Sequence, residues 1–312
     1  NFKISKCDTY FKYKSNTYSQ MISEIMMNYE ELIKLKKPKL IIVFGDVNST
    51  LACALVGRNN NVPIAHVEAG LRSHDLSMVE EVNRKLVDSI SDYLFTPSLD
   101  ANKNLISEGI KKNKIFFSGN VMIDTMLEFK KKIQSSKILE KYNLKSNEYC
   151  LVTLHRPENV DDKKKFQKIL NIIINLSFDI KFIFPVHPRT RNNFFNLINK
   201  ISKQKENKII FCDPLDYFPI QKLIKEAKII ITDSGGIQEE STHYNTSCLT
   251  LRKNTERPIT IKLGTNTLVS EKNITKLFYK KIKERKIIKK RIPKWDGRAS
   301  LRIYKYLNEK IV

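Results

Sequence analysis

Acidic, histidine and arginine side chains recur at loop positions in the first half of the chain. They stand at three consecutive sites: Asp46, then His66 with Glu68 and Arg72, then Glu80 with Arg84. Asp46 lies in a strand-to-helix turn, where its carboxylate could receive a proton or hold a hydroxyl group. His66 and Glu68 are two residues apart and therefore face the same side of an extended segment. A single carboxylate at such a place is more often a cap or an ion-pair partner, but three acids and a histidine together favour chemistry.

In the second half, two apolar runs each lead into histidine and arginine residues. His155 and Arg156 follow residues 150–154, and His187 follows residues 182–184. A lone histidine in such a place is usually a structural residue. In an open parallel sheet, however, ligands bind outside the carboxyl ends of the strands, where these three residues would lie.

The most specific pattern follows residues 228–232. Gly235 and Gly236 would let the backbone approach a ligand, and the amides of a helix N-terminus favour a phosphate. Ser234 could cap that helix or give its hydroxyl to the phosphate. Glu240, one turn into the helix, could bind ribose hydroxyls, and Arg257 supplies a cation for a second phosphate. A pyrophosphate-holding second half and a carboxylate-rich first half together describe a nucleotide-sugar site.

Positioning these loops calls for strands that alternate with helices. Apolar runs typical of strands buried on both faces of a parallel sheet cover residues 40–44, 150–154, 182–184, 208–211 and 228–232. Helical patterns lie at residues 18–35, 49–58, 82–90, 161–176 and 217–227. This alternation predicts an α/β protein with mostly parallel sheets. At about 150 residues per domain, the 312 residues suggest two domains, and the lysine-rich stretch 124–148 reads as a helix plus linker between them.

The chain is strongly basic, with 56 Lys and Arg residues against 33 Asp and Glu residues and a net charge of +23. Such an excess is typical of nucleic-acid-binding proteins, but the lysines are spread evenly and no aromatic platform accompanies them, so we expect no nucleic-acid partner. Five scattered cysteines without a Cys-x-x-Cys pair argue against a disulfide framework and a zinc ribbon. No apolar run reaches the roughly 20 residues of a membrane-spanning helix. We therefore expect a cytoplasmic protein without membrane insertion.

Five motifs, in order, resemble those of the non-hydrolysing UDP-N-acetylglucosamine 2-epimerase family. They are His66-Val-Glu68-Ala-Gly-Leu-Arg72-Ser, Glu80-Glu-Val-Asn83-Arg84, His155-Arg156-Pro-Glu158-Asn159, Asp233-Ser234-Gly-Gly-Ile-Gln-Glu-Glu240 and Thr255-Glu256-Arg257-Pro258. The resemblance covers nearly the whole chain. It implies a glycosyltransferase-B-like fold, in which two Rossmann-like domains with parallel sheets have the active site in the cleft between them.

The same resemblance divides the chain into domains. Residues 1–124 would form an N-terminal Rossmann-like domain joined by a C-terminal helix at 296–312, and residues 125–295 would form the UDP-binding domain. Family members usually open with a first strand and a Gly-Thr-Arg-Pro-Glu type loop, which nothing here matches, so we expect the first domain to lack both. Val47 and Val79 stand where threonine and proline are common. The loop between Arg72 and Glu80 is shorter than in many UDP-GlcNAc enzymes and is similar to that of members acting on diacetamido-uronic acids.

The family resemblance implies reversible inversion at C2 of a UDP-N-acetylhexosamine, which interconverts UDP-GlcNAc and UDP-ManNAc. UDP would leave by anti elimination to give a 2-acetamidoglucal and would add back to the opposite face. Asp46, Glu68 and Glu80 would be the catalytic carboxylates, and His155 would stabilise the leaving UDP. The substrate-binding residues would be Arg72, Arg84, Arg156, His187, Ser234, Gly235, Gly236, Glu240 and Arg257.

The resemblance also implies a homodimer, no metal, no redox cofactor and a role in polysaccharide biosynthesis. Some bacterial members bind a second UDP-GlcNAc as an allosteric activator, and Arg156 and His187 resemble residues at that site. Three other activities stay open at this point. They are 2-epimerisation of a related UDP sugar of the diacetamido-uronic acid type, a hydrolysing epimerase that releases ManNAc and UDP, and a glycosyltransferase on the same fold.

Overall fold

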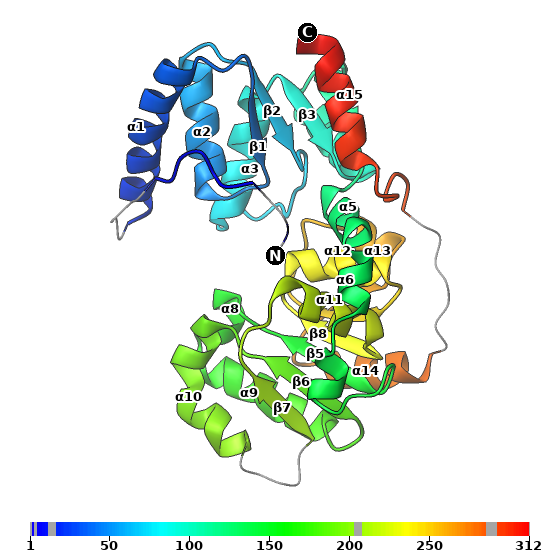
Figure 1. Cartoon of the computed structure of the whole chain (residues 1–312). Coiled ribbons are helices and arrows are strands. Elements are labelled where there is room, and N and C mark those ends of the chain that lie inside the picture. Colours follow the sequence, from blue (N-terminus) through cyan, green and yellow to red (C-terminus); the bar gives the residue numbers. More distant parts are fainter. Residues whose placement is uncertain (1, 3–4, 12–16, 203–207, 285–291, 312) are drawn as a thin grey trace. The chain divides into compact units, whose positions relative to one another are not determined.

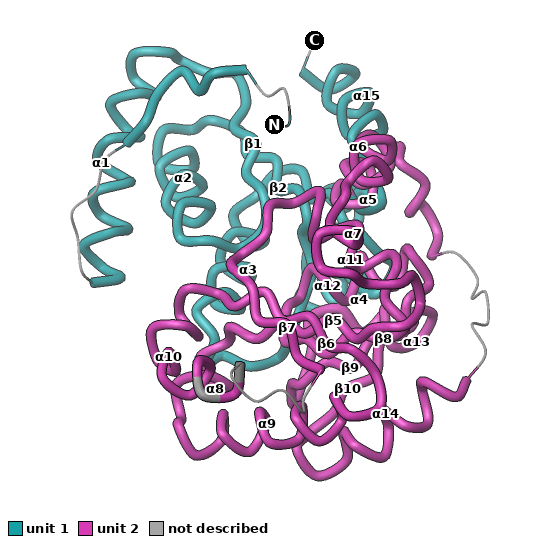
Figure 2. Tube along the Cα trace, turned by 60° about the horizontal axis from the view of Figure 1, so that its bottom comes forward, with its two compact units in different colours: residues 1–120, 299–312 teal, residues 121–298 magenta. Residues whose placement is uncertain are grey.

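The computed structural model describes residues 2, 5–11, 17–202, 208–284 and 292–311. The chain divides into two compact units, which are coloured separately in Figure 2. Unit 1 comprises residues 1–120 and 299–312, and unit 2 comprises residues 121–298. The boundaries predicted from the sequence, after residue 124 and before residue 296, lie a few residues inside unit 2. No helix in the described ranges is long and apolar enough to cross a membrane.

Unit 1 is built on a parallel sheet in the order β1-β2-β3-β4 (Figure 1). The strands are β1 (Ile41–Phe44), β2 (Ile64–Val67), β3 (Tyr93–Thr96) and β4 (Ile115–Phe117). The helices are α1 (Tyr18–Lys36), α2 (Asn48–Asn59), α3 (Val79–Ile90), α4 (Leu99–Ser107), the short 3-10 helix η1 (Lys112–Lys114) and α15 (Ala299–Ile311). Because β1, β2 and β3 are parallel and each leads into a helix, the loops that follow them share one edge of the sheet.

Strand β1 differs from the prediction that residues 40–44 are buried on both faces. Ile41 and Val43 are buried, whereas Ile42 and Phe44 are 44% and 60% exposed. Ile41 and Val43 pack in a buried cluster with residues of α1, α2 and α3, whereas Ile42 and Phe44 alternate with them and therefore point to the opposite face. Strand β2, between β1 and β3, is buried at every position.

Unit 2 is built on a larger parallel sheet in the order β10-β9-β8-β5-β6-β7. The strands are β5 (Tyr149–Thr153), β6 (Lys181–Pro185), β7 (Ile209–Cys212), β8 (Ile229–Thr232), β9 (Ser247–Leu251) and β10 (Asn266–Val269). The helices are α5 (Val121–Glu128), α6 (Lys130–Gln134), α7 (Ile138–Lys141), α8 (Pro157–Val160), α9 (Lys163–Leu176), α10 (Pro188–Ser202), α11 (Tyr217–Glu226), α12 (Gly235–His243), α13 (Ile259–Lys262) and α14 (Ile274–Lys283). The strand order reverses between β5 and β8, which makes their carboxyl ends a topological switch point where α/β proteins bind ligands.

The strands of unit 2 are apolar along their whole length because helices cover both faces of the sheet. On β5, Cys150 and Val152 belong to one buried cluster, whereas Tyr149 and Leu151 belong to another. Helices α9 and α14 contribute to the first cluster, and α11 contributes to the second. Each large apolar side chain buried in this way stabilises the fold by roughly 1.5–3 kcal/mol.

The predicted fold class is confirmed, since both units are α/β structures with parallel sheets. All the predicted strands occur, but the prediction did not name β3, β4, β9 or β10. The stretch 124–148, predicted as one helix plus linker, instead holds most of α5 and all of α6 and α7. Ile133, Ile138 and Leu144 are buried there at irregular spacing, which explains why the sequence shows little periodicity.

Candidate active site

The turn after β1 carries Asp46 and is held by α3. Gly45 has a φ of +64°, which glycine adopts without strain, and its N–H donates to Val67 O at 3.0 Å. Arg84 donates through Nε to Asp46 Oδ2 at 2.9 Å, and its Nη2 lies 2.7 Å from the same oxygen. Asn83 Nδ2 donates to the Asp46 carbonyl at 2.8 Å. Arg84, predicted to bind substrate, is therefore a buried partner of the Asp46 carboxylate.

Glu68 follows β2 in a strained backbone conformation. Its φ is +75°, a left-handed value that costs a non-glycine residue about 1–3 kcal/mol and is concentrated at functional sites. The N–H groups of Glu68 and Ala69 both donate to Phe95 O, at 3.1 and 3.0 Å. A Cβ placed on Gly45 would lie 3.4 Å from Glu68 Oε2, so the Glu68 carboxylate lies beside the turn that carries Asp46. Two of the predicted carboxylates thus lie at neighbouring strand ends.

His66 of β2 is fully buried and bonded at both ring nitrogens. Nδ1 lies 2.7 Å from Asp88 Oδ1, and Nε2 lies 2.8 Å from the Gly45 carbonyl oxygen. Both partners are acceptors, so both nitrogens donate and the ring is an imidazolium. Burial alone would lower the pKa of His66, but Asp88 and the Gly45 carbonyl outweigh burial and raise it above its ordinary value. His66 thereby holds the turn before Asp46, a role the sequence did not reveal.

Arg72, also predicted to bind substrate, lies in the interior of unit 1. Its side chain has no exposed area, and its guanidinium donates to Leu71 O, to Asp88 Oδ2 and to both carboxylate oxygens of Glu108. Asp88 Oδ2 also accepts from the Gly70 N–H at 3.1 Å. Burial would lower the pKa of Arg72, but Glu108 and Asp88 raise it above its usual range. Arg72 therefore holds the loop after β2, and its contact with substrate stays a prediction.

The two adjacent acids at the start of α3 have opposite environments. Glu80 is exposed, whereas Glu81 is buried and accepts from the N–H groups of Ser73 and His74, each at 2.9 Å. Arg84 Nη1 lies 2.6 Å from Glu81 Oε2. Burial alone would raise the pKa of Glu81, but these hydrogen bonds and the Arg84 charge lower it. Glu81 therefore shapes the loop, and Glu80 is the acid that a ligand can reach.

In unit 2, the residues after β5 and β8 meet at Asp233. This aspartate is fully buried and accepts from the N–H groups of His155 and Arg156, and from Asn159 Nδ2, at 3.0–3.1 Å. His155 Nδ1 lies 3.1 Å from Asp233 Oδ1. Burial alone would raise the pKa of Asp233, but His155, the Arg156 N–H and Asn159 lower it. The sequence motif includes Asp233, but the sequence assigned it no role. Its hydrogen bonds connect the residues that follow β5 with those that follow β8.

His155 and His187 follow neighbouring strands of the sheet, β5 and β6. Their ring centroids lie 5.3 Å apart, and His187 Nδ1 accepts from the Arg189 N–H at 3.2 Å. Burial, together with the charges of His155 and Arg189, lowers the pKa of His187, although Asp233 opposes this. The His155 side chain is 39% exposed, so it can reach a ligand at the switch point.

Ser234, Gly235 and Gly236 form the start of α12. Neither glycine has a positive φ, so the backbone conformation does not require glycine at these positions. Close packing requires it at Gly235. A Cβ placed on Gly235 would lie 2.8 Å from Arg257 Nη1, whereas one on Gly236 would meet the movable end of Met122, at 3.1 Å. Ser234 is the N-cap residue, but its hydroxyl makes no capping hydrogen bond. The helix amides and the Arg257 guanidinium therefore lie side by side, as the predicted diphosphate site requires.

Arg257 is held at that place by carboxylates that the prediction did not single out. Arg257 Nε lies 2.9 Å from Glu239 Oε2, and Nη1 pairs with Glu256. Arg252 Nη2 lies 2.9 Å from the other oxygen of Glu256. Because Gly235 lies against Nη1, the guanidinium adds positive charge where the N-terminus of α12 already favours an anion.

Glu240, predicted to bind ribose hydroxyls, is buried in α12. Burial, reinforced by the charge of Glu239, raises the pKa of Glu240 to about 7. Burial and the Glu240 carboxylate in turn raise the pKa values of Tyr217 and Tyr244. A carboxyl group that titrates near neutral pH becomes a strong acceptor when hydroxyl donors stabilise its ionised form.

No metal-ligating cluster of three or more His, Cys, Asp or Glu side chains occurs in the part of the chain that the structure describes. The cysteines are free thiols, and Cys150, Cys212 and Cys248 are buried. Burial is the largest influence on each of these three thiols and raises its pKa.

Comparisons with known proteins agree on one family. The model of the UDP-N-acetylglucosamine 2-epimerase family matches residues 1–308. The UDP-N-acetylglucosamine 2-epimerase of Methanocaldococcus jannaschii is 42% identical over 270 residues, which cover 82% of this chain and 72% of that protein. The UDP-2,3-diacetamido-2,3-dideoxy-D-glucuronate 2-epimerase of Pseudomonas aeruginosa is 37% identical over 270 residues, 85% of this chain and 73% of that protein.

Solved structures give the same picture. The M. jannaschii UDP-GlcNAc 2-epimerase in complex with UDP-GlcNAc and UDP has a TM-score of 0.86 and 38% identity, and the match covers 95% of this chain and 82% of that one. The Neisseria meningitidis enzyme bound to UDP-GlcNAc has a TM-score of 0.84 and 28% identity, over 96% and 84% of the two chains.

Proposed function

This chain belongs to the UDP-N-acetylglucosamine 2-epimerase family, and we propose that it interconverts UDP-GlcNAc and UDP-ManNAc by inverting C2 of the sugar. The observation that carries the proposal is the start of α12, where Gly235 packs against the Arg257 guanidinium. The helix amides and this cation offer a diphosphate two kinds of partner at one place. Relatives with UDP-GlcNAc in their solved structures support a nucleotide sugar as the ligand.

We assign the nucleotide to unit 2. Ser234 and the amides of Gly235 and Gly236 donate to the diphosphate, Arg257 neutralises it, and the ionised form of Glu240 accepts from the ribose hydroxyls. As the C1–O bond breaks, negative charge grows on the departing UDP. Arg257 and His155 stabilise that charge, which lowers the barrier to elimination.

We assign the proton transfers to the carboxylates of unit 1. One carboxylate takes the C2 proton, the C2–H electrons form the C1=C2 bond of a 2-acetamidoglucal, and UDP leaves from C1 with the electron pair of the C1–O bond. UDP then adds back to C1 while a second acid delivers a proton to the opposite face of C2. Asp46, Glu68 and Glu80 share these two tasks, since the C2 proton is weakly acidic and each transfer needs a positioned group.

A related UDP sugar is the second candidate substrate. The observation that favours it is the 37% identity to a UDP-2,3-diacetamido-2,3-dideoxy-D-glucuronate 2-epimerase. Such a substrate carries a carboxylate and a second acetamido group, so it would need an additional cation and additional hydrogen bonds. The reaction class stays the same, because the bond changes at C1 and C2 are identical.

A second nucleotide-sugar site, a dimeric state and a biosynthetic role also belong to the proposed function. We propose that Arg156 and His187 hold a second UDP-GlcNAc, which acts as an activator; the 5.3 Å separation of the His155 and His187 rings supports a common binding region. We also propose a cytoplasmic homodimer that needs no metal or redox cofactor and serves polysaccharide biosynthesis. Neither a nucleic acid nor a membrane is a partner in this proposal.

Hydrogen exchange at C2 tests the proposed reaction. In deuterated water, the protein should convert UDP-GlcNAc to UDP-ManNAc and place deuterium at C2 of both, whether or not EDTA is present. An Asp46→Asn variant should exchange the C2 hydrogen at least 100-fold more slowly. Exchange with the diacetamido-uronate alone would identify the second substrate, and release of free ManNAc and UDP would identify a hydrolysing enzyme. Absence of C2 exchange with every UDP sugar tested would overturn the proposal.

A further inference from the structure

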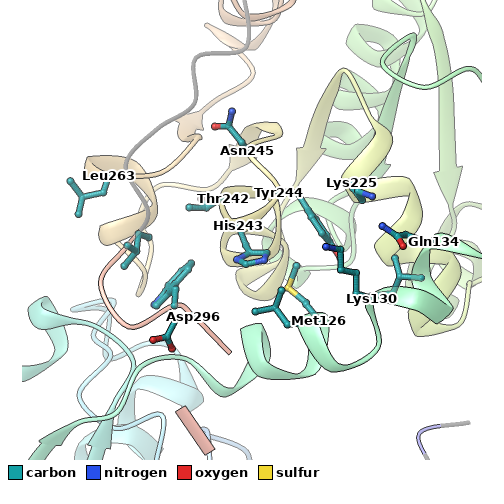
Figure 3. Close-up of a pocket in the computed structure, with 14 residues that line it drawn as sticks. Met126, Lys130, Gln134, Lys225, Thr242, His243, Tyr244, Asn245, Leu263 and Asp296 are labelled. Carbon is teal, nitrogen blue, oxygen red and sulfur yellow. The ribbon is translucent and has the colours of Figure 1, made fainter. Parts of the chain in front are cut away.

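Unit 2 contains a cavity of about 370 Å³ that is lined by none of the predicted site residues (Figure 3). Its walls come from α5 and α6, from the last turn of α12 with the residues that follow it, and from the segment 292–296. The described residues that line it all belong to unit 2. The volume lies within the range of about 300–1,000 Å³ that is typical of small-molecule sites.

One side of the cavity is apolar and aromatic. Met126, Ile292 and Trp295 belong to a buried cluster, and Tyr244 packs against that cluster. All four side chains line the cavity. A flat hydrophobic group would therefore replace water against already buried apolar surface, at a gain of roughly 25 cal/mol for each Å² that it covers.

The charged lining residues are separated in space. Lys130 of α6 and Lys225 of α11 lie at one end of the cavity, and Asp296 lies at the other (Figure 3). Lys225 Nζ is 3.6 Å from Glu226, a loose ion pair. In the described ranges Lys130 has no ion-pair partner. Lys130 is exposed and the Lys225 side chain is 33% exposed, so water screens part of their charge; the two ammonium groups together still attract an anion whose apolar part covers the wall beside them.

From these features we propose that the cavity binds a small organic anion with a flat apolar part. The apolar part lies against Trp295, Tyr244 and Met126, and the anionic group pairs with Lys130 and Lys225. Binding of such an anion in this cavity does not require the proposed epimerase reaction.

The cavity is also separate from the predicted diphosphate contacts. Its lining includes His243, the last residue of α12, and Tyr244 just beyond it, whereas Ser234 precedes the first turn. With nine residues, α12 is about 13 Å long. A ligand in the cavity and a diphosphate at the start of α12 therefore occupy opposite ends of one helix.

The single tryptophan of the chain makes the proposal directly measurable, because Trp295 lines the cavity. The probe is 8-anilinonaphthalene-1-sulfonate, an aromatic anion that accepts energy from an excited indole. Titration should quench Trp295 fluorescence in a saturable way with one probe per chain. The uncharged analogue N-phenyl-1-naphthylamine should bind at least tenfold more weakly. Probe fluorescence that rises without quenching of Trp295, or equal affinity for the two compounds, would overturn the proposal.

Charge variants identify the anion contacts. Lys130→Glu with Lys225→Glu should weaken binding of the sulfonate at least tenfold, and Lys130→Met with Lys225→Met, which keeps the apolar stems, should weaken it severalfold. The matched control is Lys272→Glu, an exposed lysine outside the cavity lining, which should bind as the unchanged protein does. Near-ultraviolet circular dichroism checks that each variant is folded. Equal losses in the Lys272 control and the Lys130/Lys225 variants would show a nonspecific charge effect and overturn the assignment.

Competition with UDP tests whether the two sites are distinct. Saturating UDP should leave the sulfonate titration of Trp295 unchanged. Competitive displacement by UDP would mean that the probe occupies the nucleotide site and would overturn the proposal. If the sulfonate binds as expected but no UDP sugar undergoes C2 exchange, the proposed function fails while this inference stands.

Discussion

His66 has a structural role that depends on its charge. Its two ring nitrogens face a carboxylate and a carbonyl, so it serves the site only as an imidazolium. Its hydrogen bond to the Gly45 carbonyl holds the turn before Asp46. Its other partner, Asp88, also accepts from the Gly70 N–H in the loop after β2. His66 is therefore a positioning residue for the predicted carboxylates.

Replacing His66 with phenylalanine should lower the free energy of unfolding by about 1–3 kcal/mol, because Asp88 Oδ1 and the Gly45 carbonyl lose a buried donor while Asp88 keeps its ion pair with Arg72. The folded-state pKa of His66 is raised above 6.5. Its stabilisation is therefore complete below pH 6.5 and is lost as the pH rises through the folded-state pKa. Urea unfolding measures the free energy of unfolding of the unchanged protein and of His66→Phe. The difference between the two should become smaller as the pH rises from slightly acidic to alkaline. A difference that grows with pH would contradict the imidazolium form of His66. His66→Gln keeps one hydrogen-bond donor and should therefore lose less unfolding free energy than His66→Phe.

Removing the charge of a carboxylate that we propose to be catalytic should slow the reaction and leave nucleotide binding unchanged. We expect Asp46→Asn and Glu68→Gln each to lower kcat at least 100-fold, since positioned acid–base groups contribute about 10²–10⁴-fold. Affinity for UDP, measured by calorimetry, should change less than twofold. Glu148→Gln alters an exposed carboxylate and should keep full activity. Wild-type kcat in either site variant would remove that residue from the proposed mechanism.

Helix α12 links several features of unit 2. Its N-terminus lies after β8 at the switch point, its first turn lies against Arg257, and its last turn lines the cavity of Figure 3. The close packing at its start leaves no room for a side chain at Gly235. The position of the helix is therefore coupled to the cation that the proposed diphosphate site uses.

The two glycines of α12 should respond differently to alanine. In Gly235→Ala the new Cβ would lie 2.5 Å from Glu256 Oε1 and 2.8 Å from Arg257 Nη1, so buried charged groups must move. We expect a loss of about 1–3 kcal/mol in unfolding free energy and at least a tenfold loss of UDP affinity. Gly236→Ala meets only the flexible end of Met122 and should cost less stability. Chemical denaturation and calorimetry measure both quantities, and equal losses of stability would refute the packing argument.

Each of the two units has its own sheet and its own buried clusters, and the proposed nucleotide contacts lie in unit 2 alone. These contacts use a few arginines and histidines and so account for little of the net charge of +23. The rest of the excess charge is spread over the chain and bears on solubility and on nonspecific binding.

Nucleotide binding should therefore stabilise the molecule unevenly. UDP at 100 times its Kd should add about 2.7 kcal/mol to the unfolding free energy of the unit that binds it. Hydrogen exchange measured by mass spectrometry should show protection in residues 153–159 and 232–240, with unchanged exchange in β2 and β3. Protection confined to unit 1 would contradict the assignment of the nucleotide to unit 2.

The sequence by itself determined the alternation of strands and helices, the place of Gly235 and Gly236 at the start of a helix after a strand, and the family resemblance. These features are local, because an apolar run, a turn residue and a motif can each be recognised within about ten neighbouring residues. The half-exposed strand β1 shows the limit of such patterns. A continuous apolar run indicates a strand, but whether helices cover one or both of its faces depends on how distant parts of the chain pack.

Only the tertiary structure decided what the charged residues contact. Arg72 and Arg84 were predicted to bind substrate, yet Arg72 pairs with Glu108, 36 residues away, and Arg84 pairs with Asp46, 38 residues away. His66 and Asp88 are likewise 22 residues apart, so no local pattern joins them. A buried charge needs a partner, and which partner it finds depends on the loops that the sheet brings to one edge. For this reason the sequence could name the charged residues of the site, whereas the fold alone separated those that hold the loops from those that a ligand can reach.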